Sequence, residues 1–153
     1  MKDAKKNQKE TKVPDYFMNR LANCHNRYQG SHKRVLCVCS AGLLRSPTAA
    51  VVLSQPPFNF NTRAAGASQE YALVPLDRVL IEWADEIVCM DDEQAYEVRK
   101  IMRDVPEVEE KEITILRIAD SFRYRDPDLM RQIAEKYSAF HPEIGEEAKD
   151  DVS

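Results

Sequence analysis

Strand signals and helix signals alternate along the middle of this chain, and this alternation limits the folds open to it. Apolar runs rich in β-branched residues occur at 35–39, 86–90 and 112–118, with a less regular one near 60–66. Apolar residues recur with helical spacing at 46–55, 75–84, 92–104 and 127–140. Strands that alternate with helices form a parallel sheet with right-handed crossovers and helices on both faces. We therefore expect an α/β fold, a single-domain three-layer sandwich around a four-stranded parallel sheet.

The segment between the first strand and the first helix, residues 39–47, has the sequence CSAGLLRSP. It begins at the carboxyl end of a strand, the edge where open parallel sheets bind their ligands. A short loop that ends at a helix N-terminus directs backbone N–H groups into one concavity, and the helix dipole favours an anion there. The same field favours a thiolate at Cys39, and Arg45 brings a planar fork that takes two phosphate oxygens at once. The segment therefore predicts a phosphate site over a sulfur nucleophile.

The residues around this loop agree with that interpretation. Ser46 is a favoured N-cap and Pro47 a favoured first helical residue, so we expect the helix to begin directly after Arg45. The chain has only 4 glycines, and Gly42 lies in mid-loop, where a positive φ is tolerated. The alternative is a structural cysteine before an ordinary strand-to-helix turn. The expected phosphate-binding positions are Ser40, Ala41, Gly42, Leu43, Leu44 and Ser46.

Composition excludes several other classes of protein. With 153 residues, 43% of them hydrophobic, the chain predicts one domain with a real core, and a net charge of −4 argues against a nucleic-acid binder. Because there is no long apolar run and no signal-peptide pattern, we expect neither a membrane span nor secretion. The 4 cysteines lack metal-binding spacing and indicate thiols in a reducing compartment, so we expect a cytoplasmic protein. We also expect a monomer. The histidines fall outside the core pattern and are assigned no chemistry: His25, His32 and His141.

Both ends of the chain differ from its middle. Residues 1–12 carry five lysines against two acids and predict a disordered basic tail. Residues 13–32 form an N-terminal extension, in which we expect one short amphipathic helix near 14–23. The main domain is expected to span 33–140, and 141–153 to form an acidic tail.

Several segments together resemble the low-molecular-weight protein tyrosine phosphatases, and most closely a compact branch found among bacterial and viral proteins. Residues 35–47 resemble the family's first strand and phosphate loop, 62–66 its second strand, 84–91 its third strand, and 118–129 the loop with its general acid. The resemblance implies that 33–140 is a phosphatase domain. It also implies hydrolysis of a phosphotyrosine protein or a small aryl phosphate through a thiophosphate on the loop cysteine, without a cofactor.

Some loop positions depart from the family pattern. Gly42 stands where the family usually has Asn, and Ala64 where it usually has Ser. In the family these two side chains help to fix the loop by hydrogen bonding, so the resemblance implies a less rigid loop here. Many members have a second cysteine at the position of Leu44, and a glycine at that of Ala41.

Two aspartates are candidates for the general acid that protonates the leaving oxygen. Asp126 precedes Pro127 and has the pattern of a helix N-cap. Asp120 closes the last strand signal, and a gapless match places it on the family's catalytic aspartate. We assign the general acid to Asp120, with Asp126, or neither, as the alternatives. Phe122 and Tyr124 either wall a cleft for a phosphotyrosine ring or pack on the domain.

Three other functions stay open. Arsenate reduction on the same scaffold needs relay cysteines on a mobile segment, and only Cys89 follows Cys39, within a strand signal. Phosphoserine hydrolysis would be favoured by a shallower cleft. A module that binds phosphate or a phosphopeptide without turnover is the alternative from another class, because fold does not determine activity and the chain departs from the family pattern at Gly42, at Ala64 and after Asp120.

Overall fold

The computed structural model describes residues 23–24, 32–40, 45–68, 70, 72, 74–119 and 123–144. The basic tail and most of the short helix expected near 14–23 lie outside these residues, but Asn23 is described and belongs to a strand. The elements are β2 (Asn23–Cys24), β3 (Arg34–Cys39), α2 (Arg45–Leu53), β4 (Asn61–Gly66), α3 (Arg78–Trp83), β5 (Glu86–Cys89), α4 (Asp92–Asp104), β6 (Glu112–Ile115) and α5 (Pro127–Phe140).

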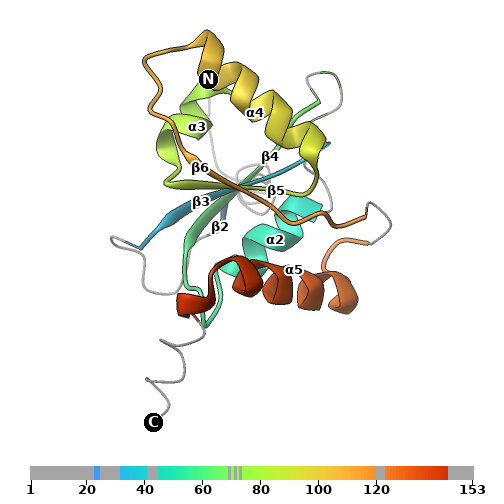
Figure 1. Ribbon diagram of the computed structural model, residues 1–153. Helices are drawn as coiled ribbons and strands as arrows, with labels where there is room; N and C mark the ends of the chain where they lie inside the picture. The colour runs from blue at the N-terminus through green and yellow to red at the C-terminus, as the bar shows by residue number, and fades with distance from the viewer. Residues whose placement is uncertain are drawn as a thin grey trace, which may run out of the picture.

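One sheet runs through the middle of the molecule (Figure 1), with the strand order β2-β4-β3-β5-β6. The strands β4, β3, β5 and β6 are mutually parallel, which confirms the predicted four-stranded parallel sheet. A fifth strand, β2, pairs antiparallel with β4 at one edge and was not predicted. The order places the carboxyl end of β3 between those of its neighbours β4 and β5, where open parallel sheets bind their ligands.

Helices cover both faces of the sheet, as the predicted three-layer sandwich requires. Figure 1 shows α3 and α4 on one face and α2 and α5 on the other. Along β3, Val35, Cys37 and Cys39 face the α2/α5 layer, whereas Leu36 and Val38 face the α3/α4 layer. Because both faces are buried, the strand is a continuous apolar run rather than an alternating one.

Two elements are shorter than the sequence predicted, each for a local reason. Leu116 and Ile118 still donate to backbone carbonyls of the segment that contains β5, at 2.9 and 3.1 Å, but the residue between them, Arg117, has a φ of 58°. This left-handed residue ends the regular strand β6 before the predicted limit at 118. α3 begins at Arg78 rather than near 75 because Asp77 is its N-cap and accepts from the Leu80 N–H at 2.9 Å.

From the sequence we expected no membrane span, and the helices can be compared with that expectation. Within the described ranges, no helix combines the length and the apolar character needed to cross a bilayer.

Candidate active site

Cys39 is the last residue of β3 and lies at the centre of the sheet's carboxyl edge. Its side chain is 4% exposed, and its Sγ lies 3.2 Å from the hydroxyl oxygen of Ser46. The same hydroxyl lies 3.2 Å from the carbonyl oxygen of Ala65, to which it can donate. A thiol at Cys39 donates to Ser46, but a thiolate can only accept. Ser46 therefore has a proton that can turn from the Ala65 carbonyl to the sulfur when the thiol ionises.

The start of α2 differs from the prediction. The helix begins at Arg45, and the side chain of Ser46 is buried against Cys39 and Ala65. Ser46 was expected to be the N-cap, but its hydroxyl is directed to the sheet. Pro47 still falls in the first turn, where a missing N–H removes no helical hydrogen bond.

Arg45 is buried, with 3% of its side chain exposed. Its Nη1 donates to a carboxylate oxygen of Asp91 at 2.9 Å and to the carbonyl of Ile118 at 2.8 Å. These contacts hold the guanidinium near the carboxyl ends of the central strands and compensate its charge, which is costly to bury unpaired. Asp91 is the N-cap of α4 and also the ionic partner of Arg45.

Gln94 connects the same region to Ser40, the residue after Cys39. Its Nε2 donates to the Ser40 hydroxyl at 3.1 Å, and its Oε1 accepts from the backbone N–H of Asp91 at 2.6 Å. The side chain is 1% exposed. Sequence reasoning missed Gln94, although one signal was present: it shares the apolar face of the helix with Val98, one turn further on.

A hollow of about 400 Å³ adjoins this network. Its walls come from the end of β3, the turn after β4 and the first turns of α4, and they include Ser40, Ala67, Ser68, Glu93, Gln94, Tyr96 and Glu97. Backbone N–H groups of Ala67 and Ser68 donate to the carbonyls of Cys39 and Ser40, both at 2.8 Å. The turn after β4 therefore holds the backbone of Cys39 and Ser40 beside the hollow.

The predicted site residues are only partly within the described ranges. Cys39, Ser40, Arg45 and Ser46 are described and lie together at one edge of the sheet. The other predicted residues that fall outside are Ala41, Gly42, Leu43, Leu44, Asp120 and Phe122. Their roles stay predictions.

The segment before α5 is described from residue 123 onward. Tyr124 is half-buried, and the backbone N–H of Arg125 donates to the Thr48 hydroxyl of α2 at 2.8 Å. Asp126 is the N-cap of α5 and accepts from the Asp128 N–H at 2.8 Å, as predicted. Its carboxylate therefore has a structural role that needs no catalysis.

The other buried cysteines differ from Cys39 in position. Cys37, Cys39 and Cys89 are reduced thiols, and Cys89 belongs to the core layer on the opposite face of the sheet from Cys39. Burial raises the pKa of the Cys89 thiol to about 12. At neutral pH Cys89 therefore stays protonated, and it does not lie beside Cys39 as a relay cysteine would.

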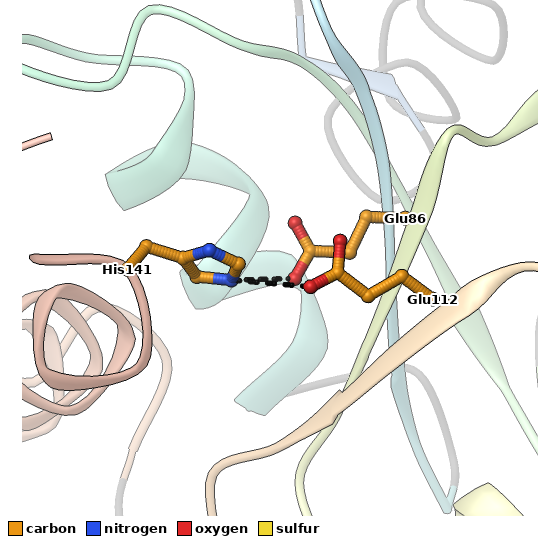
Figure 2. A group of neighbouring side chains, drawn as sticks. All are labelled: Glu86, Glu112 and His141. Atoms are coloured by element: carbon orange, nitrogen blue, oxygen red, sulfur yellow. Dashed lines mark hydrogen bonds and ion pairs between the residues drawn. The ribbon is translucent and has the colours of Figure 1, made fainter. Parts of the chain in front are cut away.

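A second charged cluster lies at the amino-terminal ends of β5 and β6, around the buried carboxylate of Glu86 (Figure 2). Lys33 approaches Glu86 to 2.8 Å, the Tyr137 hydroxyl donates to it at 2.6 Å, and Thr114 donates to its other oxygen. The His141 ring nitrogen Nε2 lies 2.9 Å from that second oxygen. Burial alone would raise the pKa of Glu86, but the hydrogen bonds from Lys33, Thr114 and Tyr137 hold it below its ordinary value.

The position of His141 corrects the sequence analysis, which placed all three histidines outside the core pattern. His141 is 7% exposed and stacks on the ring of Tyr137, with 4.4 Å between centroids. Ile144 also packs against the core, so ordered packing continues past the end of α5. His141 directly follows the last residue of α5, and its ring is buried where its Nε2 contacts the carboxylate of Glu86.

The same cluster has the composition of a metal site, since ligand atoms of Glu86, Glu112 and His141 all lie within 4.8 Å of one another. Figure 2 shows the three side chains converging from β5, β6 and the end of α5. However, the Lys33 ammonium already contacts Glu86 and also lies 3.9 Å from Glu112. A cation would have to displace this charge and the neighbouring donors, so we interpret the cluster as a structural ion pair.

The cluster leads to a prediction about stability in acid. Because the pKa of Glu86 is lowered on folding, its contribution is complete above the ordinary glutamate pKa and is lost as the pH falls through the lowered value. Glu86→Gln should lower the free energy of unfolding at pH 7 by ~1–3 kcal/mol, since Lys33 loses its partner. Urea unfolding from pH 7 to pH 3 should show a smaller acid loss in the variant than in the wild type. The exposed Glu110→Gln is the control, and an identical pH dependence for Glu86→Gln and the wild type would contradict the account.

Comparison with known proteins supports the fold. Neither a protein-family model nor a curated protein matches the sequence. Among solved structures, Wzb from Vibrio vulnificus, in complex with benzylphosphonate, is 16% identical, with a TM-score of 0.54 over 74% of this chain and 99% of that one. YfkJ from Bacillus subtilis is 16% identical, with a TM-score of 0.51 over 77% and 98% of the two chains. The tyrosine phosphatase AmsI from Erwinia amylovora is 18% identical, with a TM-score of 0.52 over 72% and 93%.

These likenesses concern the fold, because all of them lie below 20% sequence identity. Each covers nearly the whole of the other chain, so the shared part is a complete domain. The chain has the fold of the low-molecular-weight protein tyrosine phosphatases, which confirms the fold that the sequence resemblance implied.

Proposed function

We propose that this protein is a cysteine-dependent phosphatase of the low-molecular-weight type, acting on phosphotyrosine and related aryl phosphate monoesters. The observation that carries the proposal is the grouping of Cys39, Ser46 and Arg45 at the carboxyl end of the central strand. The thiol lies 3.2 Å from a hydroxyl, and the arginine is held by Asp91 and a backbone carbonyl. A nucleophile beside a proton donor and a fixed cation suits phosphoryl transfer.

The proposed reaction has two steps. Cys39 attacks phosphorus, the bond to the leaving oxygen breaks, and a thiophosphate forms on the enzyme. Arg45 and loop N–H groups stabilise the charge on the three equatorial oxygens. Water then attacks the thiophosphate, inorganic phosphate leaves, and the sulfur departs as a thiolate to which Ser46 can donate. Asp120 protonates the leaving phenol in the first step and takes a proton from water in the second.

The choice of Asp120 as general acid leads to the next prediction. Loss of leaving-group protonation typically lowers a rate by ~10²–10⁴-fold, and most for poor leaving groups. Asp120→Asn should therefore lower kcat strongly on phenyl phosphate and less on activated aryl phosphates, with little change in melting temperature. The measurement is kcat against the pKa of the leaving phenol.

Asp126 provides the matched control for that experiment. Asn caps a helix about as well as Asp, so Asp126→Asn should have nearly normal rate and stability, whereas Asp126→Ala should lose ~0.5–2 kcal/mol of stability. A steep dependence on the leaving group in Asp126→Asn, together with a flat one in Asp120→Asn, would move the general acid to Asp126.

The substrate class is proposed from two kinds of support. Tyr124 is half-buried in the segment before α5, next to Arg125, whose backbone N–H is bonded to Thr48 of α2, and we propose that its ring contacts an aromatic leaving group. Among proteins of this fold, Wzb was solved with benzylphosphonate and AmsI is a tyrosine phosphatase. An aryl phosphate is therefore the first substrate to test.

A substrate panel tests the function. Hydrolysis of p-nitrophenyl phosphate, phosphotyrosine peptides and phosphoserine peptides should be compared in the presence of a chelator. We expect turnover of the first two and much slower turnover of phosphoserine. Preference for phosphoserine would reassign the specificity, and binding of inorganic phosphate without any turnover would favour the binding-module alternative, which the glycine at position 42 kept open.

A further inference from the structure

We propose that Gln94 is a positioning residue that ties together the two ends of the phosphate loop, so that Cys39 and Arg45 keep a fixed relation. The effect expected on turnover rests on the proposed phosphatase function. The tie itself rests only on contacts among described residues.

Both ends of the Gln94 amide are in use. The NH2 group donates to the hydroxyl of Ser40, directly after the nucleophile, at 3.1 Å. The carbonyl oxygen accepts from the backbone N–H of Asp91 at 2.6 Å. A primary amide carries N–H donors and an acceptor oxygen on one planar group, so this single buried side chain can bridge Ser40 and Asp91.

Asp91 carries the connection to the other end of the loop. Its carboxylate accepts from Arg45 Nη1 at 2.9 Å, and Arg45 is the first residue of α2. The contacts therefore run from Ser40 through Gln94 and Asp91 to Arg45. Residues 40 and 45 flank the loop, and α4 acts as the support behind both of them.

The sequence of the chain makes this support more important. Gly42 and Ala64 have no side-chain hydrogen-bonding group, so neither can fix the loop by a side-chain hydrogen bond. A displacement of about 1 Å in a catalytic group can lower a rate by ~10²-fold. A single buried bridge that fixes both flanks can thus set the rate without touching the substrate.

A simpler role for Gln94 is the reciprocal cap of α4, which uses only its carbonyl oxygen and the Asp91 N–H. The two roles differ in their dependence on Ser40. A cap is indifferent to Ser40, whereas the tie requires its hydroxyl. A double-mutant cycle between Gln94→Met and Ser40→Ala therefore separates them.

Two readouts are needed, one of which does not depend on catalysis. Hydrogen exchange of the backbone amides in the segment 39–46 should become about 5–50-fold faster in Gln94→Met, because buried hydrogen bonds of the loop flanks are lost. On p-nitrophenyl phosphate, kcat should fall by about 10–100-fold with a smaller change in KM. Both effects should be non-additive with those of Ser40→Ala.

Val98→Ala is the matched control. Val98 lies one turn further along α4, fully buried in the opposite core layer from Cys39, so its truncation lowers the melting temperature without reaching the loop. It should leave the exchange of the segment 39–46 and kcat unchanged. The wild type could show no turnover while Gln94→Met still exchanges faster than the wild type. That result would support the tie and contradict the proposed function. Unchanged exchange, or effects strictly additive with Ser40→Ala, would overturn the tie even if the wild type is an active phosphatase.

Discussion

Cys39→Ser should abolish phosphatase turnover while leaving the protein folded. The serine hydroxyl is not ionised at neutral pH, so the covalent step loses its nucleophile and kcat should fall by on the order of 10⁴–10⁶-fold. The fold should survive because the new hydroxyl fills nearly the same volume and can still bond to Ser46, which lies 3.2 Å from the sulfur in the wild type. The measurement is steady-state hydrolysis of p-nitrophenyl phosphate together with a thermal melt.

A second cysteine serves as the control for this substitution. Cys89 is fully buried in β5, on the other core layer, and its thiol stays protonated at neutral pH. Cys89→Ala should lose some stability by cavity formation and keep its kcat. Near wild-type turnover in Cys39→Ser, or equal losses in the two variants, would show that Cys39 is not the nucleophile.

Arg45→Lys should be almost as damaging. A lysine keeps the charge but loses the planar fork. Arg45 meets Asp91 and Ile118 through Nη1, and a lysine that made both contacts would have no second nitrogen to offer to a phosphate oxygen. Loss of one transition-state donor typically lowers kcat by ~10²–10³-fold, and we expect at least that effect here. Inorganic phosphate should also bind more weakly as a competitive inhibitor.

Arg117→Lys is the control, because it makes the same substitution at an exposed position. Arg117 forms an ion pair with Asp92 at 2.9 Å, and its side chain is 62% exposed. Exposed pairs of this kind contribute ~0–1 kcal/mol, so Arg117→Lys should change neither stability nor kcat appreciably. If Arg45→Lys behaved like Arg117→Lys, the guanidinium would have no special role in the reaction.

The central sheet could be predicted because its strands are buried on both faces. Residues 35–39 and 87–90 are continuous apolar runs, and such runs between helical patterns indicate parallel strands. The edge strand β2 could not be predicted in this way. It has only two residues, Asn23 and Cys24, and is defined by its partners Arg63 and Thr62 rather than by a pattern of its own.

In the candidate site, too, residues close together in the sequence could be predicted, but contacts between residues far apart in the sequence could not. The spacing of Cys39 and Arg45 is local, and the structure brings both to the edge at which the sequence placed them. The ion pair of Arg45 with Asp91 joins residues 46 positions apart, and the hydrogen bond of Gln94 with Ser40 joins residues 54 positions apart. Neither contact leaves a periodic signal, so only the folded chain reveals them.

His141 was missed for a related reason. Its position after α5 suggested a polar end of the domain, but its environment depends on where that helix ends over the sheet. The buried carboxylate of Glu86 contacts the His141 ring, 55 positions away in the sequence. A single histidine after a helix carries no local sign of such a partner.

The central claim is that hydrolysis passes through a phosphoryl group on Cys39, and direct trapping tests it. The wild type and Asp120→Asn, in which breakdown of the intermediate should be slow, are mixed with p-nitrophenyl phosphate, quenched rapidly in denaturant and digested. Mass spectrometry should find one added phosphoryl group on the peptide that contains Cys37 and Cys39, with fragmentation placing it on Cys39. Its occupancy should be higher in Asp120→Asn, and the peptide that contains Cys89 should carry none. Turnover with no phosphorylated Cys39 peptide in either protein, or a phosphoryl group on another residue, would contradict the account.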